Sequence, residues 1–310
     1  MISNNHKYIG FATVVYAATL LYLHFSFQVP FSDFYKVLFI VGLGFSALAL
    51  LLLKNSPGNY IKPIFNNEKW LLLCLIVWIA FYITYGGSLI NRILPPQWIN
   101  NPQAAGIVIF IKKLLVFVLL PFLLYWSAGF TLTDFGLRKG LKEFSGKNII
   151  TAFLLLSTAI LLFQYFYGGG SKPIRSGLFS SSQLLKGLPL CYVYLILDAG
   201  LIEEFFFRGL LQSRLSLLLK STAGGIVCTA LIFGLVHAPG LFLRGAASEG
   251  MEEQMPFSFW AAYTIAYMSV AGVFLGIVYQ KTKNLWLCIF LHAMFDLLPN
   301  LPDFINTWHL

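Results

Sequence analysis

Apolar stretches long enough to cross a lipid bilayer dominate this 310-residue chain and leave few possibilities for its fold. A spanning helix needs about 20 mostly apolar residues, because the hydrocarbon core of a bilayer is about 30 Å thick. The composition agrees: 58% of the residues are hydrophobic and 11% are charged, against about 25% charged in an ordinary soluble domain. The sequence therefore predicts an all-α, polytopic membrane helix bundle and excludes a soluble globule.

The apolar stretches predict eight or nine transmembrane helices. The third and the ninth stretch are short for a spanning helix, which leaves the number open by one. The predicted spans cover residues 8–27, 35–53, 70–85, 105–128, 148–167, 186–211, 222–242, 257–279 and 285–298.

The net charge of +9 comes from basic residues scattered singly, with no patch or stripe suited to nucleic acid. We interpret them as topology signals, because cytoplasmic loops of membrane proteins are enriched in Lys and Arg. With nine spans, the connections on the side of the N-terminus hold Lys7, Lys54, Lys62, Lys69, Arg138, Lys139, Lys142, Lys147, Arg214, Lys220, Lys281 and Lys283. The other side holds only Lys36, Arg92, Lys172, Arg175, Lys186 and Arg244. This asymmetry predicts an integral protein of the cell (plasma) membrane with a cytoplasmic N-terminus.

The polar residues divide the chain into two halves. The first four predicted spans contain almost no ionisable residues; the exceptions are His24 and the pair Lys112 and Lys113, which fit poorly inside span four. A polar, glycine-containing connection follows at residues 131–147. We therefore expect a transmembrane scaffold of about four helices at residues 1–130 and a catalytic domain at residues 131–310.

Charged residues interrupt predicted span six, which reads Asp198-Ala-Gly-Leu-Ile-Glu203-Glu204-Phe-Phe-Phe-Arg208. An ionisable group at bilayer depth costs about 2.5 to 3.5 kcal/mol on insertion scales, so such residues are candidates for function. Glu204 and Arg208 are one helical turn apart, which predicts an ion pair. Glu203 is rotated about 100° from Glu204 around the helix and remains free for chemistry.

Two later spans add histidines. Span seven contains Phe233-Gly-Leu-Val-His237-Ala-Pro239, in which the proline is expected to bend or end the helix just after His237. Span nine contains His292-Ala-Met-Phe-Asp296, in which Asp296 is expected to orient the imidazole of His292 from one turn away. A lone histidine in an apolar helix is more often structural, but these residues fall on three separate helices together with the carboxylates.

The order of these motifs resembles the CAAX protease and bacteriocin-processing family of membrane proteins, which includes type II CAAX prenyl endopeptidases and Abi-type proteins. The resemblance rests on Glu203-Glu204-x-x-x-Arg208, Phe233-x-x-x-His237 and His292-x-x-x-Asp296, and it extends over about residues 147–298. It implies an intramembrane glutamate-type endopeptidase that hydrolyses a peptide bond of a membrane-associated or lipidated protein or peptide, with membrane lipid around it.

The resemblance also implies a role for each motif residue. Glu203 would be the general base, with His237 holding the water, while Glu204 and Arg208 would orient the site. His292 and Asp296 would stabilise the oxyanion. An ionised Asp has no donor, so we expect Asp296 to act through His292 rather than directly.

Other kinds of function remain open at this stage. No cofactor is expected, but Glu203, His237 and His292 form a recognised zinc ligand set, so a metal-dependent peptidase is one alternative. The four cysteines lie in apolar segments without CxxC spacing and predict no zinc framework. Another alternative is a proton-coupled transporter, although the ionisable residues cluster in one half. A third is a non-catalytic protein of immunity or regulation.

Overall fold

The computed structural model describes residues 5–53, 62–137, 146–244 and 255–310, and these residues form helices without any strand. Nine described helical segments are long and apolar enough to cross a membrane, which confirms the predicted fold class. The chain is an integral membrane protein. Its spans one to nine are Asn5–Phe27, Phe31–Leu52, Glu68–Ile93, Pro102–Ser127, Lys147–Tyr167, Ser181–Leu218, Thr222–Leu243, Phe257–Thr282 and Leu285–Trp308.

Several spans are built from more than one helical segment, and π-helical stretches, which are wider than an α-helix, join some of the α-helices. The α-helices are α1 (Asn5–Phe27), α2 (Phe31–Tyr35), α3 (Ser46–Leu52), α4 (Glu68–Phe81), α5 (Gly87–Ile93), α6 (Pro96–Asn100), α7 (Pro102–Lys113), α8 (Leu120–Ser127), α10 (Lys147–Tyr167), α11 (Lys172–Arg175), α12 (Ser181–Leu195), α13 (Ile202–Glu204), α14 (Ser213–Leu218), α15 (Thr222–Leu235), α16 (Ala238–Arg244), α17 (Phe257–Ala266), α18 (Met268–Thr282) and α19 (Leu285–Trp308). The π-helical stretches are η1 (Lys36–Phe45), η2 (Tyr82–Gly86), η3 (Leu114–Leu119), η5 (Ile196–Leu201) and η6 (Phe205–Gln212).

Spans three, six and nine are longer than the hydropathy pattern predicts. Span nine was expected to end at Leu298, before the first of two prolines, but α19 continues through Pro299 and Pro302. Span six also contains a proline, Pro189, and with 38 residues it exceeds the roughly 20 that a bilayer requires. Pro302 is buried and Pro189 is exposed, and neither proline ends its helix; spanning helices tolerate proline in this way.

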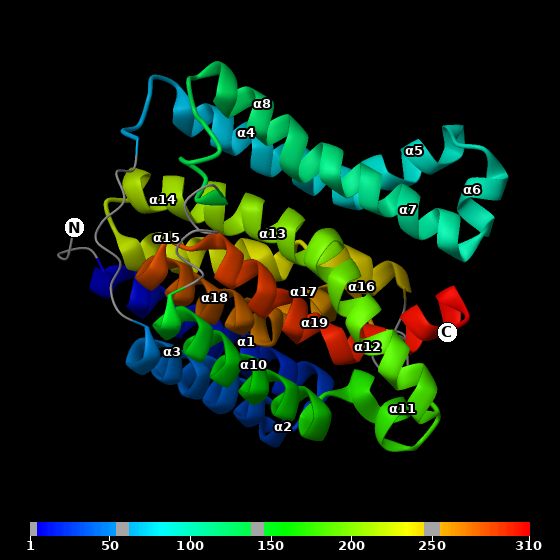
Figure 1. Cartoon of the computed structure of the whole chain (residues 1–310). Coiled ribbons are helices and arrows are strands. Elements are labelled where there is room, and N and C mark those ends of the chain that lie inside the picture. The colour runs from blue at the N-terminus through cyan, green and yellow to red at the C-terminus, as the bar shows by residue number, and fades with distance from the viewer. Residues whose placement is uncertain (1–4, 54–61, 138–145, 245–254) are drawn as a thin grey trace.

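The helices lie side by side in layers (Figure 1). Helices α4, α5, α7 and α8 form a long hairpin over one face of the bundle, and α6 lies at its far tip. The layer on the opposite face contains α1, α2, α3 and α10, and the helices of the C-terminal half lie between them. We call residues 68–127 the N-terminal hairpin. Of the boundary connection predicted at residues 131–147, residues 138–145 lie outside the described part, and the boundary stays a prediction.

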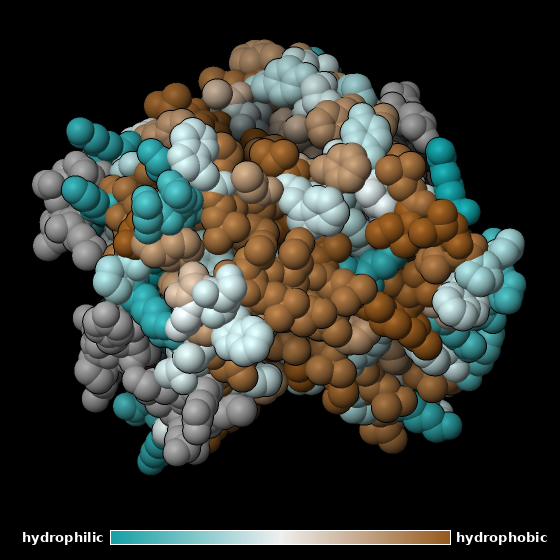
Figure 2. All heavy atoms as spheres, turned by 90° about the horizontal axis from the view of Figure 1, so that it is seen from above, coloured by the Kyte–Doolittle hydropathy of each residue, from teal (hydrophilic) through white to brown (hydrophobic). Residues whose placement is uncertain are grey.

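Apolar side chains cover the outer face of the hairpin. Viewed from that side, a broad hydrophobic belt separates hydrophilic atoms gathered toward opposite ends of the molecule (Figure 2). Large apolar side chains of the hairpin, such as Trp70, Val77 and Leu123, are exposed. Such a surface is stable in contact with lipid tails, and the belt agrees with nine spans oriented along the length of the bundle.

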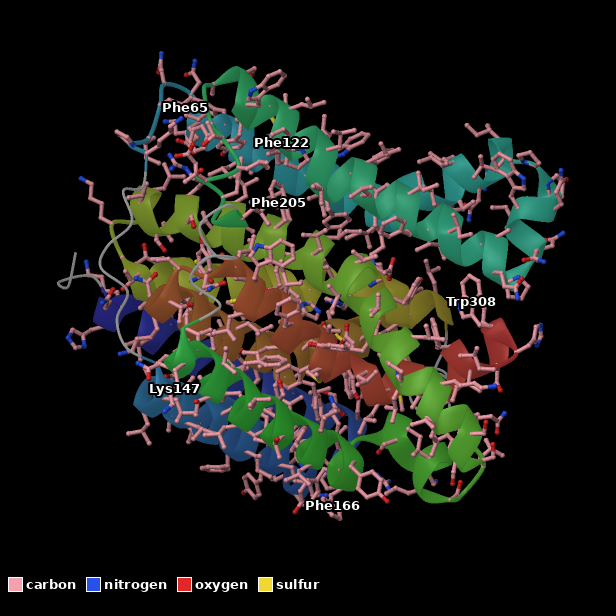
Figure 3. All side chains as sticks on the ribbon, viewed as in Figure 1. Phe65, Phe122, Lys147, Phe166, Phe205 and Trp308 are labelled. Atoms are coloured by element: carbon pink, nitrogen blue, oxygen red, sulfur yellow. The ribbon has the colours of Figure 1, made fainter. Side chains whose placement is uncertain are left out.

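Aromatic packing connects the hairpin to span six. Phe65, Phe122 and Phe205, which Figure 3 labels, belong to one apolar cluster that joins the two halves of the chain. Phe135 lies against Phe205, with ring centroids 4.9 Å apart. Since Phe205 directly follows Glu204 in sequence, this cluster fixes the back of the helix that carries the two glutamates.

A buried ion pair anchors one end of the hairpin to the end of span six. The Arg214 guanidinium pairs with the Glu68 carboxylate, and it also donates to the carbonyl oxygens of Lys62 (2.7 Å) and Pro63 (3.1 Å). The Tyr125 hydroxyl donates to Glu68 at 3.2 Å. Both charged side chains are almost fully buried, so the attraction between them must offset the cost of removing each charge from water.

We expect Glu68→Gln to destabilise the protein by about 2 kcal/mol, because the amide keeps the size of the side chain but loses the charge-assisted hydrogen bonds to Arg214. Thermal unfolding in detergent measures this loss. Asp303→Asn is the matched control, since the Asp303 carboxylate lies on the exposed face of α19. Equal unfolding temperatures for the two variants would show that the pair contributes nothing to stability.

Candidate active site

Close packing between spans six and nine brings the site together. Gly200 lies so near α19 that a Cβ atom there would come within 2.6 Å of the Ile289 carbonyl oxygen. Only glycine allows this approach without a shift of the backbone. His292 is three residues beyond Ile289, on the same side of α19, and therefore faces Glu204 of span six.

Glu204 and Arg208 form the ion pair that their spacing predicts. Arg208 Nη1 lies 2.5 Å from Glu204 Oε1, and both side chains are 0% exposed. Arg208 also donates to the Gly272 carbonyl at 3.2 Å, and its guanidinium lies 4.7 Å from the centre of the Phe233 ring. The pair thus connects spans six, seven and eight at the centre of the bundle.

Glu204, rather than Asp296, makes the short hydrogen bond to His292. Glu204 Oε1 accepts from His292 Nδ1 at 2.6 Å, while Asp296 Oδ2 lies 3.4 Å from the other nitrogen, Nε2. Asp296 thus lies beside one ring nitrogen, as its spacing predicts, and Glu204 is a second carboxylate that the spacing within one helix did not indicate. Glu204 is fully buried beside the ring, whereas the Asp296 side chain is 35% exposed at the edge of the site.

His237 lies at the helix break that Pro239 predicts. Helix α15 ends at Leu235, and α16 begins at Ala238 with Pro239 in its first turn. The His237 Nδ1 atom is 2.6 Å from the Phe233 carbonyl oxygen. A carbonyl can only accept, so Nδ1 carries a hydrogen and Nε2 presents the lone pair of the neutral ring.

Glu203 faces both histidines. Its Oε2 atom lies 3.6 Å from His237 Nε2 and 3.8 Å from His292 Nε2. This oxygen is buried and has no hydrogen-bond partner in the described part of the chain. Both distances are longer than a direct hydrogen bond and suit a small molecule bound between the three groups.

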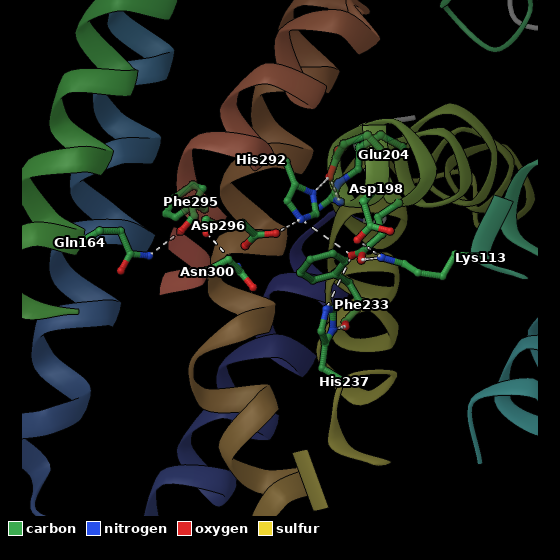
Figure 4. Close-up of polar contacts among 12 residues, drawn as sticks. Lys113, Gln164, Asp198, Glu204, Phe233, His237, His292, Phe295, Asp296 and Asn300 are labelled. Carbon is green, nitrogen blue, oxygen red and sulfur yellow. Dashed lines mark hydrogen bonds and ion pairs between the residues drawn. The ribbon is translucent and has the colours of Figure 1, made fainter. Parts of the chain in front are cut away.

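Two further charged residues belong to the site, and the sequence motifs did not identify them as such. Lys113, at the end of α7 in the N-terminal hairpin, donates to Asp198 at 3.0 Å, and its Nζ lies 3.9 Å from Glu203 Oε1 (Figure 4). Asp198 is in η5, just before the two glutamates. A signal was present in both cases, since each is an ionisable residue inside a predicted span.

The structure does not arrange these residues as a metal centre. Within the described residues, no three His, Cys, Asp or Glu side chains are grouped in a way that could hold a metal ion. The zinc set considered from the sequence, Glu203, His237 and His292, therefore has no support in the geometry.

Comparison with known families agrees with the motif order. Residues 185–298 match the family model described as Type II CAAX prenyl endopeptidase Rce1-like. These residues, which we call the Rce1-like region, are thus similar to the CAAX protease family. Neither the curated proteins nor the solved structures gave a match. The Rce1-like region contains all six motif residues and Asp198, but Lys113 lies well before it.

Proposed function

We propose that the protein is an intramembrane glutamate-type endopeptidase that hydrolyses a peptide bond of a membrane-associated or lipidated protein or peptide. The observation that carries this proposal is the position of Glu203 Oε2, a buried carboxylate oxygen without a hydrogen-bond partner among the described residues, opposite two imidazole nitrogens. The match of residues 185–298 to the Rce1-like family model supports the same class of reaction.

In this reaction Glu203 is the general base. It takes a proton from a water molecule held between its Oε2 and His237 Nε2, and the water oxygen attacks the carbonyl carbon of the scissile peptide bond. Protonated Glu203 then returns the proton to the leaving amine as the carbon–nitrogen bond breaks. His237 suits the water-holding role, because its Nδ1–H bond to Phe233 leaves Nε2 as an acceptor.

His292 stabilises the oxyanion in this proposal. Its Nδ1 donates to Glu204, so a donor at Nε2 requires a ring that carries both hydrogens. The carboxylates of Glu204 and Asp296 lie at opposite nitrogens of this ring, an arrangement that suits a cationic imidazole. Arg208 holds Glu204 in place, and Asp296 acts next to His292 without touching the oxyanion.

The substrate class follows from the surroundings of the site. All six motif residues lie on spans, so a substrate must reach them from within or beside the membrane. A peptide with an apolar or lipidated segment meets this requirement, and prenylated C-terminal peptides are one candidate that the family name suggests. We further propose a cytoplasmic N-terminus in the cell membrane, because the basic connections favour that side.

Comparison of membrane peptides tests this function. Cells that contain the wild-type protein should accumulate cleavage products that are missing from cells with Glu203→Gln at equal abundance. Identical peptide profiles, together with a phenotype that survives the substitution, would instead indicate a binding protein or transporter.

Metal analysis of the purified protein, with activity measured before and after chelation, distinguishes a metal-dependent peptidase from a metal-independent one.

A further inference from the structure

Lys113 is a cation that the N-terminal half brings to the catalytic carboxylates. It lies at the end of α7, in a span whose one other charged residue is Lys112, and its side chain is 21% exposed. An ammonium group within a spanning segment is costly unless it is paired. Its partners, Asp198 at 3.0 Å and Glu203 at 3.9 Å, both come from span six.

The two oxygens of Glu203 have different surroundings. Oε1 is the atom nearest Lys113, whereas Oε2 faces His237 and His292. A cation on one oxygen fixes the rotation of the carboxylate and so determines where the other oxygen points. Charge interactions of this kind are strong where water is scarce. Asp198 in turn holds the lysine, because its Oδ2 accepts the shorter bond.

The neighbouring lysine has a different environment, although it is adjacent in sequence. Lys112 donates to the Asn91 side chain at 2.6 Å and to the Gly87 carbonyl at 3.4 Å, both within the N-terminal hairpin. The two lysines therefore have separate tasks: Lys112 holds the hairpin together, and Lys113 connects it to span six.

We propose that Lys113 is a positioning residue for the peptidase site. Its ammonium group holds the Glu203 carboxylate so that Oε2 faces the two histidines. This inference rests on the proposed function. It also means that the site is incomplete within the Rce1-like region alone, since the residue that orients the base is supplied by the hairpin.

The first experiment measures peptide hydrolysis by the full chain in liposomes. Lys113→Met should lower kcat by roughly 10- to 100-fold with little change in KM, because a misplaced base slows the chemical step without altering binding. Lys113→Arg should recover most of that loss, and Lys112→Met should behave like the wild type. Unchanged kcat in Lys113→Met, while Glu203→Gln is inactive, would overturn this inference and leave the proposed function intact.

A double variant separates positioning from simple charge neutralisation. Lys113→Met leaves the Asp198 carboxylate without its cation, and this alone could disturb folding. Lys113→Met/Asp198→Asn removes both partners. If Lys113 positions Glu203, the double variant should be as slow as Lys113→Met but as stable as the wild type. Recovery of kcat would show that Lys113 serves only to neutralise Asp198, and would overturn the proposal.

A cross-linking experiment tests the contact without any turnover. Dicyclohexylcarbodiimide, which enters membranes, activates a carboxyl group and lets a touching amine form an amide bond, with dicyclohexylurea as the other product. Mass spectrometry of the treated protein should find Lys113 joined to Asp198 or Glu203, and no such product from Lys112. Absence of both cross-links from a protein that is modified at Asp198 or Glu203 would contradict the proposed position, whether or not the protein is a peptidase.

Discussion

Glu203→Gln is expected to reduce kcat for peptide hydrolysis by roughly 1,000-fold, within the range typical of a lost general base. The amide has nearly the same size as the carboxylate but cannot accept a proton from water at neutral pH. It can still occupy the space between Lys113 and the two histidines, so the fold and KM should change little. Single-turnover kinetics with a saturating peptide separate this effect on chemistry from binding.

Glu203→Asp is the informative control for that variant. It keeps the carboxylate but withdraws it by one methylene from His237 and His292, so activity should fall less than in Glu203→Gln. The two variants should have wild-type unfolding temperatures. If Glu203→Gln retained more than about a tenth of the wild-type kcat, Glu203 would not be the base.

Glu204→Ala is expected to have the largest effect on stability, a loss of about 3 to 5 kcal/mol, because it leaves the Arg208 guanidinium buried without its counter-ion. Arg208 is 0% exposed and would keep only its bond to the Gly272 carbonyl and the Phe233 ring. Denaturation in mixed micelles measures the change. Asp296→Asn is the control, because it alters a partly exposed carboxylate and should shift stability by less than about 0.5 kcal/mol.

Adding Arg208→Met to Glu204→Ala should restore most of the stability, since an apolar side chain of similar length replaces the unpaired cation. Activity should not return, because His292 Nδ1 still lacks the carboxylate that holds it. Recovery of both properties together would mean that Glu204 serves only to neutralise Arg208 and has no part in orienting His292.

Contacts within one helix were predictable from the sequence. The spacing of Glu204 and Arg208 predicted their ion pair, and Pro239 predicted the helix break at His237, because both depend only on helical geometry. Hydropathy likewise predicted eight or nine spans, and the described residues contain nine candidates. The motif order also led to the family that the match over residues 185–298 bears out.

Contacts between helices were not predictable in the same way. The bond from His292 to Glu204 depends on how closely Gly200 lets α19 approach span six, and no single-helix pattern contains that distance. Likewise, Lys113 looked like a misplaced charge because its partners lie in another span. An ionisable residue inside an apolar stretch indicates that a partner exists, but the packing of the bundle decides which one.

The attachment of the N-terminal hairpin to span six through charged pairs at Glu68 and Lys113 has a consequence for protein engineering. Glu68 with Arg214 and Lys113 with Asp198 both pair a hairpin residue with a residue of span six. A shortened protein cut to residues 185–298 would leave Arg214 and Asp198 without the hairpin residues that pair with them. Chimaeras that exchange this region between relatives should therefore exchange the hairpin as well, so that each charge keeps its counterpart.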